Sequence, residues 1–361
     1  MAQHPFGNDP AKIARYRSFW RRESVSRPLV GFSLKSWFPL QEFAASAAWQ
    51  EHDVLTPEMV SPEAFLEDQD RLLREGETLD DDILRGASPS QAVPWLDGML
   101  GCRLRILPAS ILGEERRLSW DEAEGIALDT ENPWYRLYMA SLDTLAAHAA
   151  GRYPVSHGTL VGPSDMAAVL RGHGQHVLDL VYEPERAAGL LWRMAEIFCR
   201  ITTDAWERLP LYGGGYYDAQ YQLWAPGPII RMQEDASALY SPDLYRRYLE
   251  PVDRMVADRF PCAFMHLHST SMHLLDAFLG IETLGCYEVN YEVISGGPPM
   301  REMVRYYRRF QEADKSLLIR GSFTPDEVRL MMDTLEPRGL YLYIMVESNA
   351  EVDALRPLVG M

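Results

Sequence analysis

The sequence predicts an α/β protein, a (β/α)8 TIM-type barrel with an N-terminal helical capping extension. Four short apolar runs near the C-terminus recur at roughly the 20–30 residue spacing that a strand and its covering helix need. Amphipathic segments lie between these runs, as expected for helices outside a parallel barrel. The 361 residues are 47% hydrophobic and 24% charged, which is ordinary for a globular protein with a large core. We expect one domain over 1–361, with capping extension and first barrel elements in 1–150 and regular βα units in 151–361.

The N-terminal extension is the less regular part of the chain. Arginines alternate with aromatic residues over 15–22, which indicates an amphipathic helix rather than a basic arm. An apolar run over 27–34 predicts a strand, and helices are expected around 62–75 and 134–150. The segment 86–98 is rich in Pro, Gly and Ser, so we expect an ordered loop over the barrel mouth.

The second half of the chain predicts alternating strands and helices. Long helices are expected over 184–209 and 241–259, the second capped by Ser-Pro-Asp. The predicted strands are 262–269, 284–292, 316–322 and 339–348. The predicted helices that follow them are 271–280, 300–314, 324–337 and 349–359. Thr324, Pro325 and Glu327 match an N-cap, an N1 proline and a capping-box Glu, so the start of the third helix is well defined.

The net charge and the cysteine content limit which binding partners and which cellular compartment are expected. The net charge is −17 and no Lys/Arg run could follow a phosphate backbone, so nucleic acid is not expected as a partner. The four cysteines are far apart with no CxxC spacing, which favours a reducing cytoplasm over a disulfide framework. No leader-like segment and no apolar run of about 18 residues occurs, so no membrane association is expected.

Polar residues close the predicted strands, at the end where a parallel barrel opens. Because these strand ends share one mouth, their side chains are the candidates for chemistry. We predict catalytic roles for Glu288, Asn290 and Arg320. We predict substrate contacts for His157, Tyr217, Gln220, Trp224 and Asp235. Two alternatives stay open: Arg320 can clamp an anion or pair structurally with a carboxylate, and the aromatic stretch 216–224 can wall a planar ligand or pack in the core.

His266 and His268 are separated by one residue in a predicted strand, so both imidazoles face the same side. That geometry suits a metal ion, although strands also hold neutral histidines in ordinary hydrogen bonds. Zinc needs a third protein ligand and an open position. We predict Glu347, at the end of the last strand, as the third ligand, with Glu288 as the competing one.

Several stretches together resemble the uroporphyrinogen decarboxylase and cobalamin-dependent methyltransferase superfamily. They are PVSHGTLVGPSDMAAVLRG, YEPERAAGLLWRMAE, RMQEDASALYSPDLYRRYLEP and MHLHS. The most specific element is the pattern carried by Asp235, Ser241, Pro242 and Tyr245. The resemblance covers residue 94 to the C-terminus, and it implies a barrel with its site at the C-terminal face.

The resemblance also separates two chemistries. Uroporphyrinogen decarboxylases carry an arginine-rich MRQAGRY segment and an HNLGHG-type loop, where this chain has RPLVGFSLKSWFPL and VESNAE. The methyltransferase branch is more similar, since it binds zinc through H-x-C and a distant cysteine. Here the motif is His266-x-His268 and Glu347 stands where the cysteine is expected. The resemblance therefore implies zinc, a small-molecule substrate activated through an oxygen group, and a corrinoid supplied by a partner protein.

Two other functions remain open from the sequence. One is a metal-independent decarboxylase or lyase in which Arg320 holds a carboxylate substrate and Glu288 or His266 donates a proton. The other is a ligand-binding barrel without catalysis, because a fold does not by itself imply an activity. A homodimer is compatible with each of the three functions.

Overall fold

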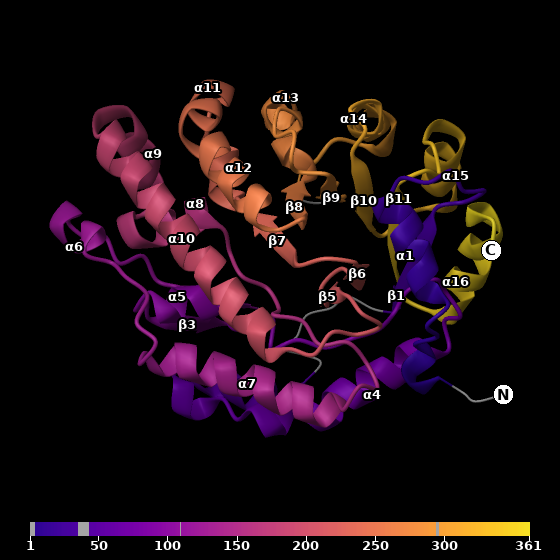
Figure 1. Cartoon of the computed structure of the whole chain (residues 1–361), viewed down its shortest axis with the longest axis horizontal. Coiled ribbons are helices and arrows are strands. Elements are labelled where there is room, and N and C mark those ends of the chain that lie inside the picture. The colour runs from indigo at the N-terminus through magenta and orange to yellow at the C-terminus, as the bar shows by residue number, and fades with distance from the viewer. Residues whose placement is uncertain (1–3, 35–42, 109, 294–295) are drawn as a thin grey trace.

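A six-stranded parallel sheet, in the order β1-β11-β10-β9-β8-β7, forms the centre of the molecule. The computed structural model describes residues 4–34, 43–108, 110–293 and 296–361. The strands are β1 (Leu29–Leu34), β7 (Ile229–Gln233), β8 (Cys262–His268), β9 (Cys286–Asn290), β10 (Ser316–Gly321) and β11 (Leu340–Val346). The edge strands of this sheet are β1 and β7. The sheet curves and helices surround it, so the fold is a barrel-like α/β fold (Figure 1).

The arc between β7 and β1 is spanned by extended chain rather than by regular strands. Asp82 N donates to Val30 O at 3.0 Å, which holds the first extended segment against β1. The second extended segment contains Val155, and a single parallel bridge joins Val155 to Ala87 of the first segment. The described residues therefore contain six strands in the central sheet, two fewer than a complete eight-stranded barrel.

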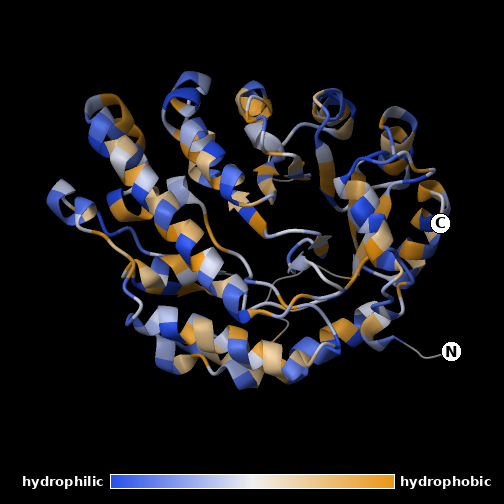
Figure 2. Ribbon diagram, viewed as in Figure 1, coloured by the Kyte–Doolittle hydropathy of each residue, from blue (hydrophilic) through white to orange (hydrophobic). Residues whose placement is uncertain are grey.

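Helices cover the outside of the sheet and alternate with its strands. Those in the second half are α8 (Pro163–Arg171), α9 (His173–Tyr182), α10 (Pro184–Arg208), α11 (Pro242–Leu244), α12 (Glu250–Arg259), α13 (Leu275–Leu279), α14 (Met300–Glu312), α15 (Pro325–Thr334) and α16 (Asn349–Leu355). The peripheral helices carry both hydrophilic and hydrophobic bands, as amphipathic helices on a barrel should (Figure 2). The helix predicted over 241–259 contains a π-helical stretch at Tyr245–Leu249. None of the described helices has the length and apolar character needed to cross a bilayer.

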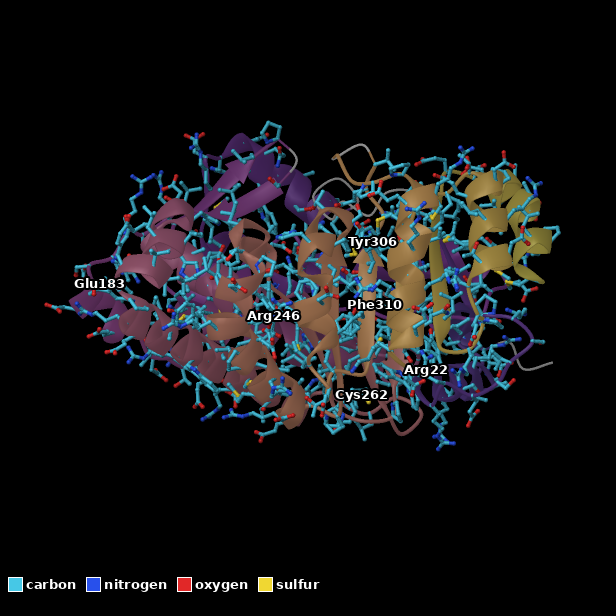
Figure 3. All side chains as sticks on the ribbon, turned by 90° about the horizontal axis from the view of Figure 1, so that it is seen from above. Arg22, Glu183, Arg246, Cys262, Tyr306 and Phe310 are labelled. Atoms are coloured by element: carbon cyan, nitrogen blue, oxygen red, sulfur yellow. The ribbon has the colours of Figure 1, made fainter. Side chains whose placement is uncertain are left out.

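Strands and helices run in opposite directions, which defines the two ends of the sheet. In Figure 3, Cys262 at the start of β8 and Arg22 before β1 lie at the lower edge. Helix α14 runs back toward that edge from Tyr306 to Phe310. The C-terminal ends of the strands therefore meet at the opposite end.

The N-terminal half supplies helices and one small antiparallel sheet, and the chain just before β7 supplies a second. Its helices are α1 (Lys12–Trp20), α3 (Ala44–Ala47), α4 (Leu66–Glu77), α5 (Trp95–Met99), α6 (Trp120–Glu124) and α7 (Pro133–Ala149). β2 (Val54–Leu55), β3 (Leu104–Leu107) and β4 (Ser110–Gly113) form one sheet, and the β5 (Tyr216–Asp218) and β6 (Leu223–Ala225) hairpin forms the other. The loop predicted over 86–98 thus ends in a short helix, α5.

Helix α1 packs against the β5–β6 hairpin. The Tyr16 hydroxyl donates to Gln222 O at 2.6 Å, and Trp20 Nε1 donates to Trp224 O at 2.8 Å. Ile13, Tyr16 and Phe19 belong to the same apolar cluster as the inward side chains of the strands. The amphipathic helix predicted near residues 15–22 is therefore present, and its aromatic face closes the barrel interior.

The capping box of α15 offers a direct test of local stability. Thr324 accepts from Glu327 N, and Glu327 Oε2 accepts from Thr324 N at 2.8 Å, as the sequence predicts. Thr324→Ala should lower the free energy of unfolding by about 1 kcal/mol because one backbone N–H loses its acceptor. Urea unfolding measures the change, and Thr324→Ser, which keeps the hydroxyl, should stay close to wild type. Equal stability of the alanine variant would contradict the role of the cap.

Candidate metal centre and active site

Strand register gathers the polar residues of the site. Alternate residues of a strand face the same side, so His266 and His268 share the inner face of β8. Lateral pairing sets Gln233 beside His266 and His266 beside Glu288. It also sets His268 beside Asn290, and Asn290 beside Arg320. Two adjoining rows of polar side chains therefore lie at the C-terminal ends of β7 to β10.

Asp235, His266 and His268 form a group that fits a metal ion. One ligand atom from each lies within 4.8 Å of the others, and His268 Nε2 is 3.4 Å from Asp235 Oδ1. Two ligand atoms bonded to one tetrahedral zinc ion are roughly 3.3 Å apart, given bonds of about 2.0–2.1 Å. Asp235 lies two residues after the end of β7, the neighbour of β8. Two imidazoles and one carboxylate are a donor set that zinc accepts.

The predicted third ligand, Glu347, does not belong to this group. Its side chain is exposed after the end of β11, and its backbone N donates to Glu351 Oε2 at 3.1 Å. Strands β9 and β10 lie between β8 and β11, whereas β7 is adjacent to β8. Distance across the sheet thus removes Glu347 and leaves Asp235, which we had predicted as a substrate contact, as the available carboxylate.

Each histidine has a carboxylate at its Nδ1 atom. Glu288 Oε2 contacts His266 Nδ1, and the Tyr221 hydroxyl lies 2.8 Å from the same nitrogen. Glu292 Oε2 lies 2.7 Å from His268 Nδ1. In metal sites, ligating histidines commonly donate their second N–H to a carboxylate, which fixes the ring and leaves Nε2 for the ion. Glu288, predicted as catalytic and as a competing ligand, therefore lies where it orients His266.

The charges at this group are carried by the His268 imidazole and by the two acids beside it, Asp235 and Glu292. Hydrogen bonds to Asp235 and Glu292 raise the pKa of His268 to about 10. Burial opposes ionisation of Asp235, but its contacts with His268 and His266 outweigh it and lower the pKa to about 2. His268 therefore carries a proton between two carboxylates, and an ion that binds there must displace that proton.

Two arginines stand beside the metal group. Arg231 donates to Gln220 Oε1 and to Gln233 Oε1, and Arg320 Nη1 lies 3.5 Å from Asn290 Oδ1. Both guanidinium carbons lie over the Tyr221 ring, at 6.0 and 5.9 Å from its centroid. The predicted pair Asn290 and Arg320 is thus brought next to the histidines.

Our sequence-based prediction missed three residues of the site: Arg231, Gln233 and Glu292. All three could have been found from strand alternation. Arg231 and Gln233 occupy every second position of the apolar run Ile229–Gln233, in the same pattern as His266 and His268. Glu292 follows Asn290 at the same spacing. Tyr221 belongs to the aromatic stretch 216–224 singled out in the sequence, and it reaches His266 from the segment between β5 and β6.

The remaining predicted substrate contacts lie in different surroundings. Gln220 accepts from Thr159 Oγ1 at 2.5 Å and from Arg231, so it belongs to the polar group. Tyr217 and Trp224 are buried in the interior cluster, and their polar atoms donate to Leu84 O and Tyr212 O. His157 is buried edge-on against a tryptophan of α10, and burial lowers its pKa to about 4. The structure therefore unites only Gln220 and Asp235 with the histidines.

A buried set of acids lies behind the site, and it makes stability depend on pH. Burial raises the pKa of Asp253 to about 7, although hydrogen bonds to Tyr245 and Glu234 oppose the rise. The folded chain therefore holds a proton that the unfolded chain releases above about pH 4, so stability should fall as pH rises from there to about 7. Asp253→Asn should flatten this fall, which cannot exceed about 1.4 kcal/mol per pH unit for one proton.

Urea unfolding between about pH 5 and about pH 7 measures the slope. The matched control is Asp258→Asn, an exposed residue on the same helix α12, which should keep the wild-type slope. Identical slopes for the two variants would show that Asp253 does not hold the proton.

The sequence matches no family model and no curated protein. A comparison with solved structures finds similarity to a methyltransferase from Methanosarcina mazei, with a TM-score of 0.62 and 13% sequence identity. The similarity covers 96% of this chain and 97% of that one. At this identity the likeness shows that the two chains share a fold over nearly their whole length.

Proposed function

We propose that this chain is a metal-assisted methyltransferase that binds zinc through Asp235, His266 and His268. The observation that carries this is the convergence of the three ligand atoms within 4.8 Å, with a carboxylate at the Nδ1 atom of each histidine. The fold shared with a methyltransferase supports the assignment, as does the resemblance to the corrinoid-dependent branch of the uroporphyrinogen decarboxylase superfamily. Under this proposal the two extended segments complete an eight-stranded barrel, and a partner protein supplies the corrinoid.

When bound, a zinc ion with nitrogen and oxygen ligands supplies Lewis acidity toward an oxygen or sulfur group of the substrate. The chain's own residues position the reaction. Glu288 and Tyr221 hold the His266 ring, and Glu292 holds the His268 ring. Asn290 Nδ2 donates to Glu292 Oε1 at 2.5 Å and thereby orients that carboxylate. The substrate enters at the C-terminal ends of the strands, where Asn290 and Arg320 are partly exposed.

Spectral titration with a methylated corrinoid protein tests this function. The zinc-loaded chain, supplied with simple methyl acceptors that bear a hydroxyl or thiol, should convert the methylated corrinoid spectrum to the demethylated one. Chelator-treated chain should not, and zinc should restore the change. Demethylation at equal rates with and without zinc would end the metal-assisted mechanism.

The second candidate is a metal-independent lyase. The direct contact between Glu288 and His266, with Glu288 fully buried, favours it because such a pair can move a proton without an ion. Release of carbon dioxide from a carboxylate substrate by chelator-treated chain would support this function over methyl transfer.

A further inference from the structure

Two guanidinium groups at the site form no ion pair with an acidic residue of the described part of the chain. Among the described residues, no carboxylate oxygen lies within 4.0 Å of a guanidinium nitrogen of Arg231 or Arg320, whereas most other arginines have one. Arg231 is only 1% exposed. The Nε atoms of both arginines are buried without a hydrogen-bond partner in the described part of the chain.

Burying a guanidinium costs several kcal/mol unless its charge and its N–H groups are compensated. Here the hydrogen-bond partners are neutral amides: Gln220 and Gln233 for Arg231, and Asn290 for Arg320. These amide oxygens accept hydrogen bonds from the guanidinium groups but carry no negative charge. Each arginine therefore keeps unused donors in a fixed direction, which is how proteins prepare a site for a planar anion.

The two arginines share one place next to the metal group. Both lie over the ring of Tyr221, whose hydroxyl contacts His266. Hydrogen bonds also run from Arg231 through Gln233 to Asp235, and from Arg320 through Asn290 to Glu292. An anion held by these arginines would therefore lie beside the ligands of the ion.

We propose that Arg231 and Arg320 bind the carboxylate of a small organic acid, which is the substrate of this site. The assignment as substrate rests on the proposed function, whereas the binding itself does not. A single negative charge is favoured over a dianion because two acids are also close: Glu288 contacts His266, and Asp218 Oδ1 accepts from the backbone N of Tyr221 at 2.9 Å. A phosphate would meet stronger repulsion from these acids.

A cavity lies beside Tyr343, on the strand next to that of Arg320. Its volume is about 60 Å³, and it is lined by Ser33, Gln222 and Tyr343 among others. Tyr343 is the lateral partner of Arg320 in the sheet. The cavity has room for several water-sized groups, and it lies one strand away from Arg320.

Calorimetric titration of the full chain tests the proposal with matched pairs: acetate and acetamide, butyrate and butyramide, benzoate and benzamide. At least one acid should bind about tenfold or more tightly than its amide, as expected for hydrogen bonds to a charged group. Inorganic phosphate should bind more weakly than that acid. Arg320→Gln should remove the preference, with the acid weakened about tenfold and the amide unchanged.

Arg320 is the better position to change because it is partly exposed, whereas Arg231 is buried. Arg305→Gln, an exposed arginine on α14, is the control for loss of one positive charge and should bind as wild type does. The proposal is overturned if every acid binds like its amide, if no acid binds, or if Arg320→Gln leaves the preference intact. Tighter binding of phosphate would overturn the choice of a carboxylate.

The same titrations, run with zinc-loaded and chelator-treated chain, separate the two proposals. Acid preference in a chain that binds no zinc would sink the methyltransferase proposal and keep the anion site. Stoichiometric zinc binding without a preference for the acid would overturn the anion site and keep the methyltransferase proposal.

Discussion

A His268→Ala variant is expected to lose stoichiometric zinc, while wild-type chain binds one ion. His268 Nε2 lies 3.4 Å from Asp235 Oδ1, so the variant removes one of three ligands and leaves the carboxylate without its partner. The loss of affinity should exceed the 10- to 100-fold typical of a residue that only orients a ligand. Metal analysis after dialysis against a defined zinc concentration measures it.

Two further variants serve as comparisons for His268→Ala: one should weaken zinc binding moderately, and one should leave it unchanged. Glu292→Gln keeps the shape of the residue at His268 Nδ1 but removes its charge, so affinity should fall by about 10- to 100-fold. His52→Ala changes an exposed histidine of the N-terminal half and should bind zinc as wild type does. If His268→Ala and wild type hold the same amount of zinc, or neither holds any, the metal centre is refuted.

Trp224→Ala should lower the free energy of unfolding by about 3–5 kcal/mol, the largest stability effect that we expect. The side chain is fully buried in the interior cluster, and its Nε1 donates to Tyr212 O at 2.7 Å. Its ring also fills the space over Gly215, where a Cβ atom would collide with it. Removal leaves a cavity that the rigid β5–β6 hairpin and α1 cannot close.

Trp192→Ala is the matched control, because that tryptophan is on α10 and 41% exposed. Its unfolding free energy should change far less in the same urea experiment. The comparison also decides between two roles of Trp224. A variant as stable as wild type but weaker in ligand binding would show that Trp224 contacts a ligand, as we predicted from the sequence, rather than packing the core.

Several elements followed from local signals in the sequence. Apolar runs ending in polar residues predicted β8 to β11, and α10 and α15 begin where Pro184 and the Thr324 cap indicate. The signal was weaker where extended chain replaces strands, in the segments near Ala87 and Val155. Those segments contain Pro, Gly and Ser, and they make only one bridge with each other.

In the candidate site, too, some features followed from the local sequence and others did not. Spacing alone placed His266 and His268 on one face, since alternation in a strand is a local property. The proposed third ligand changes from Glu347 to Asp235, because the choice depends on which strands are neighbours. The sheet order puts Asp235 beside β8 and Glu347 three strands away.

By itself, the sequence determined that the chain forms alternating strands and helices and that two histidines lie on the same side of one strand, because periodicity and caps act over a few residues. Only the tertiary structure decided which distant groups meet them. Asp235, Tyr221 and the unpaired Arg231 reach the site through strand order and the β5–β6 hairpin. Such contacts depend on the packing of the whole chain, and no local pattern encodes them.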